Sequence, residues 1–215
     1  MSSGHNRIVL VVAGAGPLLF FAIATLEGFL RAGYDPIAQP ISALALGDRG
    51  WIQTFNFGLL ALSFVAMAAI ARTELRSRAA SFGFLIMAIG VAIAGTFPMD
   101  APGALPTRAG NLHMLGGFLV FPLMPIVLLR VGLQLRRDAR WRSYSVYTLV
   151  TGLLCLATIA FFLTFVGPPG FARPFPDLAG LVQRLQLLPF FVWMAFVVHH
   201  ARRDPTAALD LAIAK

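Results

Sequence analysis

Six long stretches without a charged residue constrain this chain more than any other feature. They cover residues 8–26, 50–71, 79–99, 109–129, 143–172 and 185–198. A helix needs about 20 apolar residues to cross a membrane. Five stretches are long enough alone, and the sixth becomes so if it begins near Leu178 and tolerates Arg184. The stretches do not alternate with period two, so they predict helices and not the strands of a barrel.

Composition supports a membrane location, because 58% of the residues are hydrophobic and only 12% are charged. A soluble domain carries roughly 25% charged residues. We therefore predict an all-α integral membrane protein, a six-transmembrane-helix bundle within residues 1–200. A short cytoplasmic tail, 201–215, follows. The helices are expected at approximately 8–30, 51–72, 79–97, 110–132, 143–166 and 178–200.

The first helix raises the alternative of a signal peptide. Arg7 precedes it, and Ala22-Ile23-Ala24 resembles a cleavage site. Its apolar stretch of 19 residues is longer than the usual core of about 7–15. We expect a retained helix.

The formal net charge of +8 is distributed unevenly along the chain. If the segments alternate between the two sides of a membrane, one side holds twelve Arg and Lys residues and four acids, and the other holds five of each. Such an excess predicts the cytoplasmic side. We therefore expect both termini in the cytoplasm. The location that we predict, a bacterial inner membrane, draws also on the family resemblance given below. The cations face lipid headgroups, so we expect no nucleic-acid partner.

Polar residues gather at the opposite, outer edge. Glu27 shares a helical face with Ala13, Gly16, Phe20 and Ala24, and small residues on such a face allow close helix contact. Glu27 then points into the bundle, where an acid is a functional candidate; simple hydration at headgroup level is the alternative.

The following loop, "YDPIAQPISALALGDRGW", contains Asp35 and Ser42. Ser42 is expected either to cap a short helix or to contact a ligand. Beyond this loop, Asn56 favours a hydrogen bond between helices.

The segment "GTFPMDAPGALPTRAGNLHMLGG" contains Asp100 and His113 at the same edge. Pro98 should end the preceding helix, and the next should begin near Gly110 with His113 in its first turn. A histidine beside a carboxylate can act as a base, a proton relay or a ligand. The alternative is a hydrogen bond between His113 and Asp100 that clamps the loop.

Arg184 lies at the start of the last helix. We expect it either to reach the lipid headgroups, to bind an anionic group, or to pair with Glu27 or Asp100.

Known chemical motifs are absent from the sequence. There is no H-E-x-x-H, G-x-S-x-G or G-x-x-x-x-G-K-[ST] pattern. We predict no metal and no cofactor, and the single Cys155 is expected to pack as a small apolar residue.

Three segments resemble a known family. "YDPIAQPISALALGDRGWIQTFNFGLL", "FPMDAPG…NLHMLGG" and "GLVQRLQLLPFFVWM" are similar to the bacterial and archaeal membrane family called domain of unknown function nine-nine-eight. The resemblance implies a six-helix bundle in which Ser42, Asp100, His113 and Arg184 are the polar positions of the family. It supplies no activity.

These observations leave three functional hypotheses. The first is binding or transport of a small polar or anionic molecule, or of a lipid headgroup, at a site formed by Glu27, Asp35, Ser42, Asp100, His113 and Arg184. Helix breaks at Pro17, Pro122, Pro125 and Pro189 fit it. The second is an enzyme for a lipid-linked substrate, with His113 as base and Asp100 as orienter. The third is a structural or sensory protein without a ligand. The sequence leaves the oligomeric state open.

Overall fold

The structure, a computed structural model, describes residues 7–101, 103–167 and 174–202. Within them are seven α-helices: α1 (Arg7–Leu30), α2 (Gly50–Thr73), α3 (Arg78–Thr96), α4 (Arg108–Val120), α5 (Leu123–Leu135), α6 (Arg142–Phe161) and α7 (Ala179–Arg202). Short turns of helix lie at η1 (Ile41–Ala45), η2 (Phe162–Val166) and η3 (Pro176–Leu178). Most of the predicted tail, 203–215, lies outside the described residues.

Six spans are long and apolar enough to cross a membrane, as the uncharged stretches predict. The fourth span, Arg108–Leu135, consists of α4 and α5, separated at Phe121 and Pro122. Pro125 has no N–H for the Phe121 carbonyl four residues earlier, and Gln186 donates to that oxygen instead (3.2 Å). Pro17 and Pro189 lie inside uninterrupted helices.

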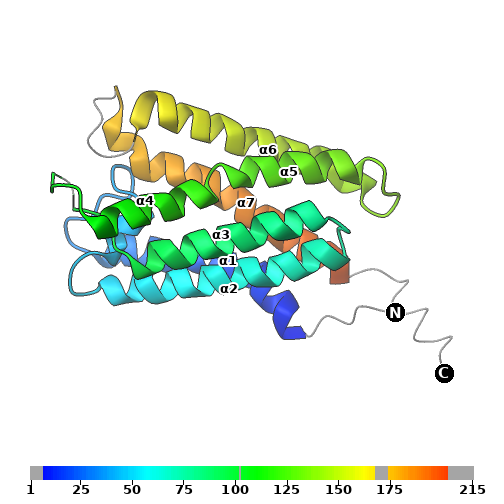
Figure 1. Ribbon diagram of the computed structural model, residues 1–215, viewed down its shortest axis with the longest axis horizontal. Helices are drawn as coiled ribbons and strands as arrows, with labels where there is room; N and C mark the ends of the chain where they lie inside the picture. Colours follow the sequence, from blue (N-terminus) through cyan, green and yellow to red (C-terminus); the bar gives the residue numbers. More distant parts are fainter. Residues whose placement is uncertain (1–6, 102, 168–173, 203–215) are drawn as a thin grey trace.

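The helices form a closed ring. In order around it, α1 packs on α2, α2 on α3, α3 on α4 and α5, α5 on α6, α6 on α7, and α7 on α1. They run side by side along the long axis of the molecule (Figure 1). Large buried aromatic side chains fill the centre, contributed by Phe20, Phe64, Phe84, Phe190 and Trp193. The ring therefore surrounds a packed core.

The two ends of the bundle differ. One end holds the short turns after α2 and α5, and both the start of α1 and the end of α7 lie there (Figure 1). We call it the arginine-rich end, after its sequences "ARTELRSRAA" and "QLRRDARWRS". The other, which we call the loop-rich end, carries the connections after α1 and α3 and the short turns η2 and η3 (Figure 1). All six residues selected from the sequence lie in or next to these connections.

Candidate functional site

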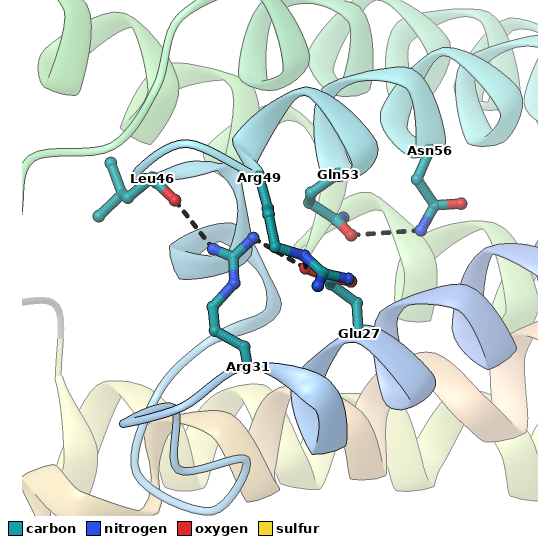
Figure 2. A network of polar contacts seen from close by, with 6 residues as sticks. All are labelled: Glu27, Arg31, Leu46, Arg49, Gln53 and Asn56. Carbon is teal, nitrogen blue, oxygen red and sulfur yellow. Dashed lines mark hydrogen bonds and ion pairs between the residues drawn. The ribbon is translucent and has the colours of Figure 1, made fainter.

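A buried carboxylate, Glu27, is the centre of the largest ion-pair cluster at the loop-rich end (Figure 2). It lies at the end of α1 on the buried face with Ala13, Gly16, Phe20 and Ala24, and is only 4% exposed. One carboxylate oxygen accepts hydrogen bonds from Arg31 Nη2 and Arg49 Nε (both 3.0 Å), and the other from Arg49 Nη2 (2.6 Å). These contacts join α1 to the start of α2.

The cluster carries more positive than negative charge, because two guanidinium groups share one carboxylate. Arg31 is largely buried and uses Nη1 to donate to the Leu46 carbonyl (2.8 Å). The Arg49 side chain is 51% exposed. The neighbouring acid, Asp48, is exposed and forms no ion pair within the described chain. Arg49 therefore presents uncompensated positive charge at the surface of the loop-rich end.

Two buried amides lie below the cluster, deeper in the bundle. Asn56 Nδ2 donates to the Phe20 carbonyl of α1 (2.9 Å) and to Gln53 Oε1 (3.2 Å), which confirms the predicted hydrogen bond between helices. Gln53 Nε2 and Asn56 Oδ1, however, have no hydrogen-bond partner among the residues that the structure describes. Buried polar atoms are nearly always hydrogen-bonded. The pair thus presents one unused donor and one unused acceptor near the ion pairs.

Arg184, at the start of α7, holds the loop between α1 and η1. It donates to the carbonyls of Pro36 (2.8 Å), Gln39 (3.3 Å) and Gly180 (3.1 Å), and to the Tyr34 hydroxyl (2.8 Å). Burial raises the pKa of the Tyr34 phenol, and the Arg184 guanidinium offsets only part of that effect. Arg184 contacts neither Glu27 nor Asp100, the two acids proposed from the sequence.

Asp35 belongs to the same loop and stabilises its turn. Its Oδ1 accepts from the backbone N–H groups of Ile37 (2.8 Å) and Ala38 (3.3 Å). Ser42 lies half-buried inside η1. The prediction that Ser42 caps a helix is wrong, because η1 begins one residue earlier and its N-cap is Pro40, which has no side-chain cap.

Asp100 organises the start of α4. Its carboxylate accepts from the backbone N–H (3.1 Å) and the hydroxyl (2.6 Å) of Thr107. Thr107 is the N-cap of α4 and accepts from the Gly110 N–H (3.0 Å). The carboxylate lies so close over Gly110 that a side chain there would collide with it. Glycine at this position therefore lets the loop fold onto the helix.

His113 is buried and bonds to the end of α3. Its Nδ1 lies 3.0 Å from the Ala94 carbonyl and 2.9 Å from the Phe97 carbonyl. Because both neighbours are acceptors, Nδ1 must carry the proton. The last carbonyls of a helix lack intrahelical partners, and His113 satisfies two of them. The predicted hydrogen bond between His113 and Asp100 is wrong, because His113 bonds to backbone carbonyls at the end of α3 and Asp100 bonds to Thr107.

The six selected residues thus do not form one hydrogen-bonded cluster, although Arg184 and Asp35 stabilise the same loop. No hydrogen bond or ion pair joins any two of them within the described residues. Sequence reasoning did not select Arg31, Arg49 or Gln53. Arg31 follows Glu27 by four residues, a spacing that favours an ion pair, whereas no local signal connects Arg49 to Glu27.

In residues 7–101, 103–167 and 174–202, no three His, Cys, Asp or Glu side chains are placed to hold a metal.

Comparison with known proteins adds a family. A family model described as "Protein of unknown function (DUF998)" matches residues 14–200. No curated protein and no solved structure matches the chain significantly. The match begins within the first span and ends near the close of the sixth, and it includes both the Glu27 cluster and the groups around Arg184, Asp100 and His113.

Proposed function

The chain belongs to the DUF998 family of proteins of unknown function, and from this premise we propose that it binds a small anion or an anionic headgroup at its loop-rich end. Phosphate and carboxylate groups are the chemistry in question. The proposed site comprises Arg49, Glu27 and Gln53. The single observation that carries the proposal is the excess of guanidinium over carboxylate in this partly buried cluster.

The geometry of Arg49 supports this assignment. Its Nε and Nη2 bind Glu27, and its Nη1 makes no hydrogen bond with the described residues. Glu27 fixes the guanidinium plane, and a planar guanidinium with free N–H groups suits phosphate or carboxylate oxygens. The unused Gln53 Nε2, four residues further along α2, offers a second donor if the ligand reaches below the ion pair.

The other polar residues support a positioning role. Arg184, Asp35, Asp100 and His113 each bond to loop backbone or to a helix cap. Asp100 does not contact His113, so the acid–base pair of the enzyme hypothesis is not assembled. We assign these residues to holding the loops that surround the site.

We further propose that the arginine-rich end faces the cytoplasm of a bacterial cell and that the protein lies in the inner membrane. The excess of Arg and Lys at that end supports this orientation. The anion site then faces outward. Cysteine labelling from the outside of intact cells, with single cysteines placed at exposed Asp48 and Arg137, tests the orientation: only the first should react.

Ligand binding is tested with the full chain in detergent. Inorganic phosphate and glycerol 1-phosphate are titrated by calorimetry, and small molecules and lipids that co-purify are identified by mass spectrometry. We expect Arg49→Gln to abolish binding and to remove any co-purifying anion. Arg108→Gln is the matched control, because Arg108 is an exposed arginine at the same end. Equal binding by both variants, or no bound anion with wild-type protein in either assay, would refute the proposal.

A further inference from the structure

A groove on the opposite side of α2 from Arg49 has no role in the proposed anion site. It lies between α2 and α3 at the loop-rich end and has a volume of about 590 Å³. That volume falls within the range of small-molecule sites, about 300–1,000 Å³. Its walls are formed by Gly50, Trp51, Thr54, Phe57, Gly58, Ala61, Val91, Ala92, Gly95, Thr96 and Pro98, with Ala45 and Gly47 at the rim.

The lining suits an uncharged, amphipathic occupant. None of its residues is ionisable. Hydroxyl groups and loop backbone line the groove toward the loop-rich end, whereas Ala61, Val91 and Ala92 line it further along α2 and α3, away from that end. Trp51, Thr54, Gly58 and Ala92 are exposed on the outer surface of the bundle. The groove is therefore continuous with the surface that faces acyl chains in a membrane.

Gly58 keeps the groove open without being required by packing inside the chain. A side-chain carbon built on Gly58 would meet no neighbour within 4 Å. A carbon on Gly95, by contrast, would lie 2.7 Å from Phe57 Cβ. Glycine inside a helix costs about 1 kcal/mol relative to alanine. Close packing between α2 and α3 explains Gly95, whereas no contact within the described residues requires glycine at position 58.

Thr54 adds a free donor. Six other threonines in the described α-helices donate to the carbonyl four residues earlier: Thr25, Thr73, Thr96, Thr148, Thr151 and Thr158. The Thr54 hydroxyl makes no hydrogen bond within the described residues. It lies about 6 Å along α2 from its start, given the rise of 1.5 Å per residue, next to Trp51, a residue type typical of the membrane interface.

We infer that the groove binds a glycerolipid of the adjacent leaflet, with an ester carbonyl accepting from Thr54 and an acyl chain lying along Gly58. A transmembrane helix is the competing occupant, because small residues four apart also favour helix contact. The groove extends over Gly50–Ala61, about 16 Å along α2 at 1.5 Å per residue. Its lining has no ionisable side chain and offers the Thr54 hydroxyl as a donor, which favours an uncharged lipid segment with an ester carbonyl above an acyl chain.

The test uses the full chain in nanodiscs of phosphatidylethanolamine and phosphatidylglycerol that contain a trace of a diazirine-labelled diacyl lipid. Crosslinks are mapped by mass spectrometry. We expect them to concentrate in residues 50–61 and 91–98. Gly58→Leu and Ala92→Leu, which fill the groove from its two walls, should each lower these crosslinks at least fivefold. Ala69→Leu is the matched control, because Ala69 is an exposed small residue of α2 outside the groove.

A second measurement tests the ester contact. One neutral hydrogen bond corresponds to about a two- to tenfold preference. Wild-type protein should favour the diacyl label over a diether label by this factor, and Thr54→Val should remove the preference. Crosslinks spread evenly over the helices, or unchanged in both groove-filling variants, would overturn the inference. The inference would also be overturned if the wild-type protein formed a crosslinked dimer that Gly58→Leu abolished. That result would show that a helix of a second copy occupies the groove.

Discussion

Replacing Glu27 by glutamine removes one negative charge from beneath two guanidinium groups and keeps the size of the side chain. Arg31 is largely buried, and its hydrogen bond to a charged partner is worth about 1.5–3 kcal/mol. The Arg49 side chain is 51% exposed, so its pair is discounted to the surface value of about 0.2–1 kcal/mol. We therefore expect Glu27→Gln to lower the free energy of unfolding by about 2–4 kcal/mol.

Thermal unfolding of the full chain in detergent measures this loss. For chains of 150–250 residues, 1 kcal/mol corresponds to about 2–4 °C in Tm, so a decrease of roughly 6–12 °C is expected for a loss near 3 kcal/mol. Asp48→Asn is the control, because Asp48 is an exposed acid at the same end and surface substitutions change stability by about 0.5 kcal/mol or less. If both variants unfold within 1 °C of each other, the Glu27 cluster contributes no net stability and the reasoning fails.

Two further predictions concern the loop after α1. Arg184→Lys should raise the rate of amide hydrogen exchange in residues 34–40 at least tenfold. A single ammonium group cannot reach three carbonyls and the Tyr34 hydroxyl together. An unchanged exchange rate would show that the loop is stable without the Arg184 hydrogen bonds. Burial raises the pKa of Tyr34, so its contribution to stability is complete below about pH 10, the ordinary value for tyrosine, and decreases as pH rises through the folded-state pKa. The Tm of Tyr34→Phe should therefore decrease less than the Tm of the wild type between pH 9 and pH 11. Parallel curves of Tm against pH for the two proteins would contradict this prediction.

The sequence predicted the membrane fold because the relevant physics is local. Each of the six spans is a stretch without charge, and a lipid environment requires such stretches to be helical. The interruption between α4 and α5 had a local signal in Pro122 and Pro125. What the sequence did not indicate was that Gln186, 65 residues away, supplies the missing donor. That contact depends on how α7 packs in the ring.

The candidate site was harder to predict, because its partners are distant in sequence. Glu27 was identified from its helical face, but Arg49 is 22 residues away. The intervening loop turns at Gly33 and Gly47, both with positive φ, and no periodic pattern describes such a path. Reasoning from side chains alone also paired His113 with Asp100. The structure shows that unsatisfied carbonyls at the end of α3 compete for His113, while the N-cap of α4 engages Asp100.

The ion-pair cluster and the groove are separated by the geometry of α2 itself. Successive residues turn by about 100° around a helix. Gln53 and Asn56 therefore lie on the face toward α1, whereas the face formed by Thr54, Gly58 and Ala61 is centred about 140° away, beside α3. A charged headgroup bound at Arg49 and an acyl chain bound along Gly58 therefore contact different faces of α2. For this reason the two proposals succeed or fail independently, and Gly58→Leu should leave phosphate binding at Arg49 intact.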